Sequence, residues 1–305
     1  MGYEILDGVP AVMKRKLSLL IFAFSLFCLS SCFMGWSEFF YRDDQVNKRS
    51  RSIVNFDGTE YAPAAINENC FSIIIFSDIH FGTLDEKFLK NFLNWMEKKK
   101  SELGSVCPLK FIACLGDVTS EASSSEYREY RNFCDEVFNR TGLRIYTIPG
   151  NHDLYSSGWD NWKEYVWPHT GAYRFTTRNG NGSLSWYFLD SANGTLGNPQ
   201  YENLTMAMKN DPNDKIVFSH YPLYANGWWY YIMQNLNERD ALISLYAKNH
   251  VKYLFSGHAH FEHDHEFGNY FYERSLAAFK RNGEVVVFRV NLKEKKYDSE
   301  KFYMD

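Results

Sequence analysis

Cysteine pairs with the C-x-x-C spacing and an excess of basic charge are both missing from this sequence of 305 residues. None of its six cysteines forms a C-x-x-C pair, so the sequence indicates neither a zinc knuckle nor a dense disulfide framework. The 33 basic and 37 acidic side chains give a formal charge of -4, without the broad positive field of non-specific nucleic-acid binders. We find no internal repeat and no low-complexity block. The composition therefore favours a small-molecule substrate over nucleic acid.

The longest apolar run lies near the N-terminus, at Leu17–Cys28, and it is shorter than the roughly 20 residues that span a bilayer. Three basic residues precede it, and Leu29-Ser30-Ser31-Cys32 follows, an order that resembles a bacterial lipoprotein signal. We expect residues 1–32 to be this signal, with Cys32 lipidated and the protein membrane-anchored outside the cytoplasm. An uncleaved membrane helix is the alternative, and Met13 is an alternative start to Met1.

Strands and helices alternate along most of the remaining chain, after a polar, irregular stretch at residues 33–69 that we interpret as a tether. Residues 70–305 are expected to form one α/β domain that begins with a β-α-β-α-β pattern. The predicted strands are Phe71–Phe76, Lys110–Leu115, Leu143–Ile148, Leu184–Leu189, Lys215–Ser219, Lys252–Ser256 and Glu284–Val290. The predicted helices are Leu84–Leu103, Ser124–Asn139 and Glu238–Asn249.

Carboxylate, imidazole and amide side chains follow five of these strands, where ligands bind in open α/β sheets. Together they supply nitrogen and oxygen ligands without thiolate, a set that suits Zn, Mn, Fe or Co. Seven donors are too many for one tetrahedral ion but suit two ions that share a bridging carboxylate. The seven candidate metal ligands are Asp78, His80, Asp117, Asn151, His220, His258 and His260.

The order D-x-H, G-D, G-N-H-D, H and G-H-x-H, from Asp78 to His260, resembles the calcineurin-like metallophosphoesterase superfamily. The resemblance implies a sandwich of two mixed sheets flanked by helices, and a centre of two divalent metal ions. It also implies that Asp117 bridges the ions. The first ion would be held by Asp78, His80 and His260, and the second by Asn151, His220 and His258.

The same resemblance assigns catalytic roles to His152 and Asp153 within the G-N-H-D motif. His152 would contact the phosphate and help the leaving oxygen, and Asp153 would orient His152 by accepting its second ring N–H. The implied reaction is hydrolysis of a phosphoester by in-line attack of hydroxide generated at the ions.

The motifs also indicate which branch of the superfamily the chain resembles. Protein serine/threonine phosphatases carry arginines in G-D-x-x-D-R-G, whereas this chain has Gly-Asp-Val-Thr-Ser-Glu-Ala at residues 116–122. The chain instead resembles the bacterial class III phosphodiesterase branch, and we expect a phosphodiesterase acting on a small molecule. Three alternatives stay open: an extracytoplasmic phosphomonoesterase, a nuclease, and a surface lipoprotein whose catalysis is vestigial.

Other histidines and aromatic clusters are given structural roles. We expect His263 and His265, with their acidic neighbours Asp264 and Glu266, to form a solvated charged hairpin rather than another metal site. His169 and His250 are expected to be surface or packing residues. For the aromatic clusters we favour packing over a substrate wall. These clusters are Trp228, Trp229, Tyr230 and Tyr231, and separately Trp159, Trp162 and Trp167.

Overall fold

The computed structural model of the protein describes residues 45–52, 54–57, 61–63 and 66–304. The predicted signal segment, residues 1–32, lies outside the described residues, as does the first part of the predicted tether, residues 33–44. Within the described part of the chain, every helix is too short or too polar to cross a membrane.

Buried apolar strands form the centre of a five-stranded mixed sheet with the order β12-β11-β2-β3-β4. β2 (Cys70–Phe76), β3 (Leu109–Cys114) and β4 (Ile145–Thr147) are parallel. β11 (Val285–Asn291) pairs antiparallel with β2, and β12 (Lys296–Phe302) closes the edge antiparallel to β11. All but the first residue of β2 are buried, as its apolar, isoleucine-rich sequence predicts.

A second mixed sheet has seven strands in the order β1-β5-β6-β7-β8-β10-β9. β6, β7, β8 and β10 are parallel neighbours. β5 pairs antiparallel with β6 and parallel with β1, and β9 pairs antiparallel with β10. The strands are β1 (Val54–Asn55), β5 (Ala172–Asn179), β6 (Gly182–Phe188), β7 (Asp214–Phe218), β8 (Val251–Ser256), β9 (His263–Phe267) and β10 (Phe271–Ser275).

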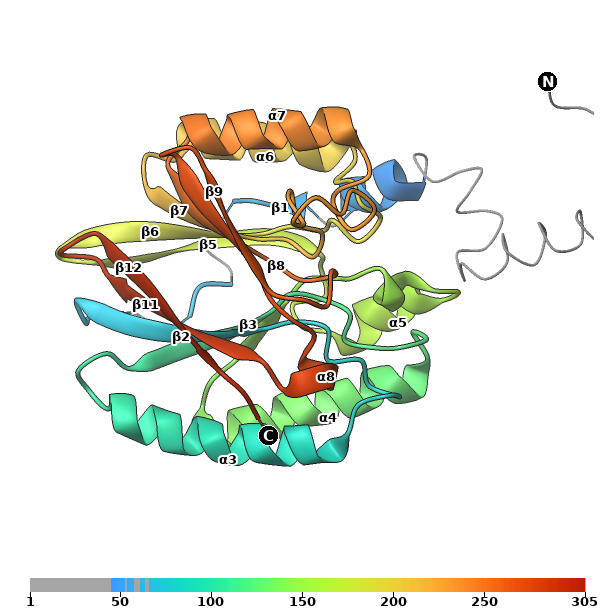
Figure 1. The fold of residues 1–305 in the computed structure, drawn as a ribbon, viewed down its shortest axis with the longest axis vertical. Helices are drawn as coiled ribbons and strands as arrows, with labels where there is room; N and C mark the ends of the chain where they lie inside the picture. Colours follow the sequence, from blue (N-terminus) through green and yellow to red (C-terminus); the bar gives the residue numbers. More distant parts are fainter. Residues whose placement is uncertain (1–44, 53, 58–60, 64–65, 305) are drawn as a thin grey trace, which may run out of the picture. The chain divides into compact units, whose positions relative to one another are not determined.

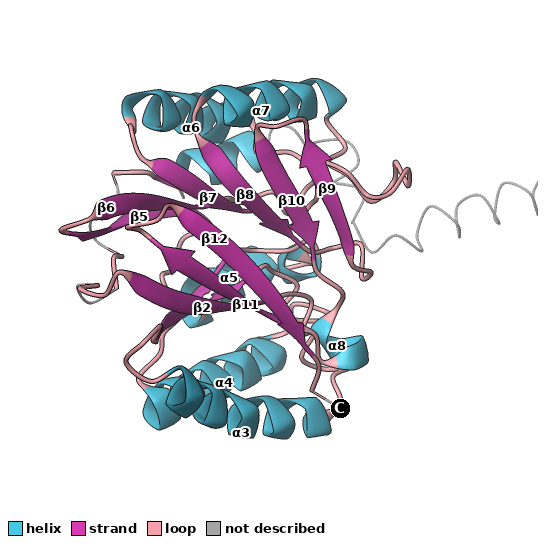
Figure 2. Cartoon of the chain, turned by 60° about the vertical axis from the view of Figure 1, so that its left-hand side comes forward, coloured by secondary structure: helices cyan, strands magenta, loops and turns pink. Residues whose placement is uncertain are grey.

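The two sheets pack face to face, and helices cover their outer faces (Figures 1 and 2). Phe111, Trp186 and Phe288 belong to the core between the sheets. α3 (Glu86–Leu103) and α4 (Ser124–Thr141) cover the five-stranded sheet, and α6 (Asn198–Asn210) and α7 (Leu236–Lys248) cover the seven-stranded sheet. The predicted sandwich of two mixed sheets flanked by helices is confirmed.

Three short helices complete the described fold: the 3-10 helix η1 (His152–Leu154), α5 (Gly158–Tyr165) and α8 (Phe279–Asn282). A capping box begins α4, in which Ser123 and Glu126 satisfy each other's backbone N–H groups. Glu126 also accepts from Glu121 N. The start of α4 therefore fixes the loop that follows β3.

The predicted tether is wrong for its second half, because the described residues there, 45–52, 54–57, 61–63 and 66–69, belong to the folded domain. Residues 45–52 are helical, and Val54 pairs with Ala172 of β5. Val46 and Ile66 are each only 1% exposed, and Arg49 forms a buried ion pair of 2.8 Å with Asp190. The few apolar side chains of this polar segment are enough to dock it, so the folded domain begins well before residue 70.

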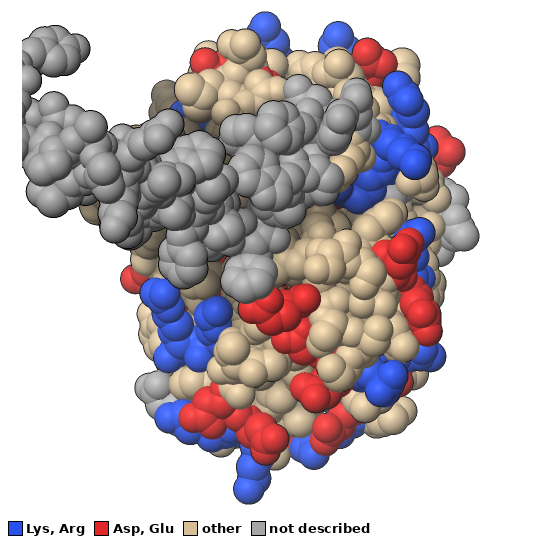
Figure 3. All heavy atoms as spheres, turned by 90° about the vertical axis from the view of Figure 1, so that its right-hand side faces the viewer, with Lys and Arg blue, Asp and Glu red and all other residues tan. Residues whose placement is uncertain are grey.

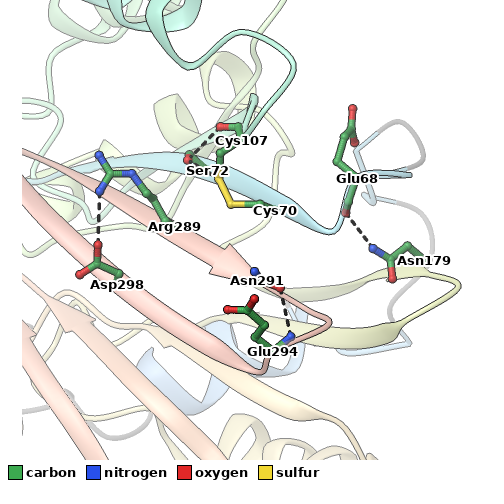
Figure 4. The surroundings of a disulfide bond; sticks show 9 residues. All are labelled: Glu68, Cys70, Ser72, Cys107, Asn179, Arg289, Asn291, Glu294 and Asp298. Carbon is green, nitrogen blue, oxygen red and sulfur yellow. Dashed lines mark hydrogen bonds and ion pairs between the residues drawn. A yellow bond between two sulfur atoms is a disulfide. The ribbon is translucent and has the colours of Figure 1, made fainter.

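A disulfide joins Cys70, the first residue of β2, to Cys107 just before β3 (Figure 4). Pairing of Ser72 with Leu109 brings these cysteines together across 37 positions of sequence. Beside it, the Asn179 amide of β5 donates to the Glu68 carbonyl, which ties the segment before β2 to the other sheet. The disulfide was not predicted from the sequence.

Candidate metal centre

The loops that follow β2, β3, β4, β7 and β8 meet at one edge of the sandwich, on the right of Figure 1. Backbone hydrogen bonds tie neighbouring loops together, since Asp78 N donates to Gly116 O and Gly257 N donates to His220 O, both at 3.0 Å. The Asp78 carboxylate also accepts from His258 N at 3.1 Å. Loops from both sheets are thus hydrogen-bonded into one site.

Six of the seven candidate ligands fall into two clusters that share one carboxylate. The first cluster is Asp78, His80, Asp117 and His260, and the second is Asp117, His220 and His258. Asp117 Oδ2 lies 3.5 Å from His80 Nε2, and Asp117 Oδ1 lies 3.5 Å from His220 Nε2. The two oxygens of Asp117 therefore face different clusters, the arrangement that a bridging ligand needs.

The seventh candidate, Asn151, faces the second cluster, with its Oδ1 atom 3.1 Å from His220 Nε2. His220 donates its Nδ1–H to the Leu115 carbonyl at 2.8 Å. That hydrogen bond leaves Nε2 as the ring atom that points toward Asn151 and Asp117. The structure therefore brings all seven sequence-predicted residues to one place.

Four buried atoms of the first cluster have no hydrogen-bond partner: Asp78 Oδ1, both ring nitrogens of His80, and Asp117 Oδ2. Buried polar atoms are normally satisfied, so a group of orphaned atoms in one cluster calls for an explanation. Carboxylate oxygens and imidazole nitrogens facing one another are a donor set suited to a divalent transition metal ion. The residues present therefore fit a metal centre.

Burial and the neighbouring charges put His80, His258 and Asp117 in the protonation states that metal ligands need. His220 differs, because burial lowers its pKa but the charge of Asp117 outweighs this and raises the pKa to about 9, so this ring must lose a proton to bind a metal ion. Burial lowers the pKa of His80 to about 4, and it lowers the pKa of His258 to about 3. Burial raises the pKa of Asp117, but the charge of His220 outweighs it and holds the pKa well below its usual range. The imidazoles of His80 and His258 are therefore neutral, and the carboxylate of Asp117 is ionised, at pH 7.

The backbone at the site is unusual, because five candidate ligands lie in the left-handed region of φ. Their φ angles are 56° at Asp78, 53° at His80, 50° at Asp117, 63° at His258 and 60° at His260. Each such residue costs on the order of 1 kcal/mol and persists only where the surrounding structure enforces it. These turns reverse the chain directly after each strand and direct successive donors at the same point.

Glycines directly before three ligands allow the loops to approach closely. A Cβ atom on Gly150 would lie 2.2 Å from Asp117 Oδ1 and 2.3 Å from Asp117 N. A Cβ atom on Gly116 would lie 2.6 Å from Gly150 N, and one on Gly257 would lie 1.9 Å from Ser77 Oγ. The glycines of the motifs are therefore required by contact between neighbouring loops.

His152 lies beside the first cluster, with its ring centroid 4.7 Å from that of His80. Its backbone N–H donates to Asp117 Oδ1 at 2.8 Å, and its Nδ1 lies 2.8 Å from the Ser120 carbonyl. A carbonyl only accepts, so Nδ1 carries the proton and Nε2 is left for chemistry. Ser120, which the sequence analysis did not single out, therefore orients this ring.

Asp153 does not orient His152, and this part of the sequence prediction is wrong. Asp153 Oδ1 accepts from the backbone N–H and the hydroxyl of Thr119, both at 3.0 Å, while Oδ2 accepts from Gly150 N at 2.8 Å. The carboxylate is buried and joins the loop after β3 to the loop after β4. Asp153 is therefore a structural link between two loops that carry ligands.

Residues 71–262 match the calcineurin-like phosphoesterase family. This range covers more than half of the chain and contains every candidate ligand. The chain belongs to the calcineurin-like phosphoesterase family. It is a metal-dependent phosphoester hydrolase, and the family's dinuclear metal centre is matched here by two clusters of histidine and aspartate that share Asp117.

Known phosphoesterases resemble the chain in sequence and in fold. A protein of Fibrobacter succinogenes, described as a probable cyclic nucleotide phosphodiesterase, is 29% identical over 198 residues, which are 61% of this chain and 71% of that protein. The crystal structure of a dimetal phosphatase from Danio rerio has a TM-score of 0.58 at 11% identity, covering 77% of this chain and 96% of that one. A 5'-nucleotidase from Candida albicans has a TM-score of 0.51 at 14% identity, covering 81% of this chain and 53% of that one.

Around the centre of this phosphoesterase, the remaining histidines lie on the predicted hairpin or at the surface, but His263 and His265 are partly buried against Tyr224, so their predicted solvation is wrong. His263 and His265 lie on β9, which forms an antiparallel hairpin with β10, and Asp264 on the same strand pairs with Arg274. His169 and His250 are exposed. On the side of the centre shown in Figure 3, basic and acidic side chains are interspersed over the visible described surface.

The two aromatic clusters differ from each other. Trp162 is fully buried and Trp159 and Trp167 are partly buried, so packing is confirmed for that cluster. In the other cluster Trp228, Trp229 and Tyr230 are exposed, so the preference for packing is wrong there. Sequence alone did not distinguish the clusters because both are aromatic runs in irregular segments.

Proposed function

We propose that this phosphoesterase hydrolyses phosphodiesters at a centre of two divalent metal ions held by the seven candidate ligands. The observation that carries the proposal is the pair of clusters sharing Asp117, with buried donors in the first cluster that have no hydrogen-bond partner. Two further features support a diester substrate. The loop after β3 lacks the arginines of the protein phosphatases, and the Fibrobacter succinogenes relative is described as a probable cyclic nucleotide phosphodiesterase.

The residues of the chain have distinct tasks in this reaction. When bound, two divalent ions lower the pKa of water and offset the charge that develops on the phosphoryl oxygens. Asp117 sets the separation of the two clusters, because each of its oxygens faces one of them. Ser120 holds the Nδ1–H of His152, so that Nε2 of this ring can donate a proton to the leaving oxygen when the ring is protonated.

The experiment that tests this function compares bis-p-nitrophenyl phosphate with p-nitrophenyl phosphate as substrates of the full chain. The metal-free protein receives Mn, Fe, Zn or Co separately. We expect a higher kcat/KM for the diester with at least one metal. A higher kcat/KM for the monoester would indicate a phosphomonoesterase instead, and lack of turnover with all four metals would contradict the proposal.

His152→Ala tests the role of the ring that Ser120 orients. We expect the variant to keep its bound metal, because the ring belongs to neither cluster, and to lose about 10²- to 10⁴-fold in kcat if Nε2 protonates the leaving oxygen. Metal content by mass spectrometry and steady-state kinetics measure the two effects. Substrates with a more acidic leaving group should lose less. Loss of metal would instead place His152 among the ligands.

We also propose that the protein acts outside the cytoplasm, anchored through a lipidated Cys32. The disulfide between Cys70 and Cys107 supports an oxidising compartment, because such bonds are rare in the reducing cytosol. The Leu-Ser-Ser-Cys sequence that ends the basic and apolar N-terminal segment supports the anchor.

Cys32→Ser tests the anchor. We expect the wild-type chain in the membrane fraction and the variant in the soluble fraction after cell breakage, because the variant lacks the thiol that carries the lipid. Cys134→Ser is the matched control, since Cys134 is a free cysteine within the folded domain. A variant that stays in the membrane fraction would indicate an uncleaved helix at residues 17–29.

A further inference from the structure

Four consecutive aromatic residues, Trp228-Trp229-Tyr230-Tyr231, lie in the connection between β7 and α7, and we call them the aromatic ladder. The side chains of Trp228, Trp229 and Tyr230 are 52%, 73% and 45% exposed. Contiguous exposed aromatic side chains on a folded domain usually mark a binding surface. The function of the metal centre described so far does not use them.

The connection that carries the ladder is well anchored, so its exposed rings are held in place. Leu223, Ala225 and Met233 on either side are buried. Met233 N donates to Pro222 O at 3.0 Å, and Trp228 N donates to Ala225 O at 2.8 Å. The connection therefore buries the apolar side chains that flank the ladder, while Trp228, Trp229 and Tyr230 of the ladder stay exposed.

Glu273 of β10 fixes the start of this connection. Its two carboxylate oxygens accept from Leu223 N at 2.9 Å and from Tyr224 N at 3.0 Å, and Oε1 also accepts from Ser256 Oγ at 3.1 Å. Ser256 is the last residue of β8, two positions before His258. One buried carboxylate therefore joins the start of the connection that carries the ladder to the strand that directly precedes the candidate ligands His258 and His260.

Ring contacts run from the candidate metal ligand His258 to the exposed end of the ladder. The centroid of Tyr231 lies 6.1 Å from that of His258 and 4.4 Å from that of Tyr230. Trp228 and Trp229 lie 5.7 and 6.1 Å from Tyr230. The ladder is therefore a row of rings that begins at the metal centre and ends in solvent.

From this continuity we propose that the ladder stacks on the nucleobase of a nucleotide phosphodiester whose phosphate is held at the metal centre. The proposal rests on the phosphodiesterase function proposed above. Aromatic side chains stack on any base because every base has a π face. Exposed tryptophan and tyrosine also suit a lipid surface. The contact of Tyr231 with His258 favours the base, since it places the row beside the reacting phosphate rather than on a separate face.

The test measures KM and kcat of the full chain for 3',5'-cyclic AMP and for the abasic ribose 3',5'-cyclic phosphate. In the Trp228→Ala/Trp229→Ala variant we expect KM for cyclic AMP to rise about 10-fold or more, with kcat unchanged. KM for the abasic diester should not change. The conservative Trp228→Phe/Trp229→Phe variant should keep the wild-type KM for cyclic AMP. Tyr270→Ala is the matched control, because Tyr270 is an exposed ring in the turn between β9 and β10.

A binding measurement separates failure of this proposal from failure of the phosphodiesterase function. Quenching of tryptophan fluorescence by 5'-AMP, compared with ribose 5-phosphate, reports the base without turnover. Tighter binding of AMP that depends on Trp228 and Trp229, in a chain that cleaves no diester, would support the ladder and contradict the phosphodiesterase function.

Two results would overturn the ladder proposal while diester cleavage stands. The first is equal KM for cyclic AMP and the abasic diester in wild type, with neither changed in the double Ala variant. The second concerns vesicles of phosphatidylethanolamine and phosphatidylglycerol, tested with chains that also carry Cys32→Ser. If the double Ala variant loses vesicle binding while its KM for cyclic AMP is unchanged, the ladder is a membrane surface.

Discussion

Asp117→Ala is expected to remove most of the bound metal and to lower kcat for bis-p-nitrophenyl phosphate by roughly 10³-fold or more. The carboxylate is buried, and its two oxygens face the two clusters, so its loss leaves both clusters without their shared donor. It also removes the acceptor of the His152 backbone N–H. Metal per chain by mass spectrometry and initial rates over a range of added metal measure the two losses.

Asp298→Ala is the matched control for this variant, because Asp298 is an exposed carboxylate on the edge strand β12 that pairs with Arg289 of β11. We expect it to retain wild-type metal content and rate. Circular dichroism should show that the Asp117 variant is folded. A folded Asp117→Ala protein with two metal ions and full activity would contradict the bridging role.

Gly150→Ala is expected to abolish activity without removing any ligand. Its Cβ atom would lie 2.2 Å from Asp117 Oδ1 and 2.3 Å from the backbone nitrogen of the same residue. The backbone cannot yield as a flexible side chain does, because the loop after β3 is held by Asp153 and by the β2 loop. Asp117 must therefore move away from one or both clusters, and we expect a loss of kcat comparable with that of Asp117→Ala.

Gly180→Ala provides the control for Gly150→Ala, since a Cβ atom on Gly180 meets no atom within 4 Å. It introduces the same methyl group at the turn between β5 and β6 and should leave metal binding and kcat unchanged. The measurements are metal content, kcat and the thermal unfolding midpoint of both variants. Wild-type activity of Gly150→Ala would show that the loops after β3 and β4 are free to separate.

Strands that are buried on both faces, and the ligands that follow them, were predictable from the sequence. β2, β3, β7 and β8 each contain an apolar run of three or four residues, and each strand is followed by a candidate ligand within a few residues. The pairing of ligands into two sets came from the family resemblance, and the clusters of histidine and aspartate have the same grouping. The β9–β10 hairpin was expected from its charged residues alone.

Features that depend on contacts distant in sequence were not predictable. β12 is an edge strand, and β5 lies next to the short edge strand β1. Both strands mix polar and apolar residues, so their sequences resemble those of loops. The disulfide requires the register of β2 against β3. The role of Asp153 depends on where left-handed turns place Thr119 and Gly150, which no local pattern reveals.

The division of the centre between two sheets determines when it can form. Donors from the five-stranded sheet are complete by Asn151, but those from the seven-stranded sheet begin only at His220, and Asp78 meets His258 across 180 positions of sequence. Contacts of such long range form late in folding, because a large loop must close first. A chain whose seven-stranded sheet has not yet docked therefore presents only four of the seven donors. The ions would join a nearly folded domain. Metal supply would therefore limit the gain of enzyme activity, and it would not limit the folding of the two sheets and their helices.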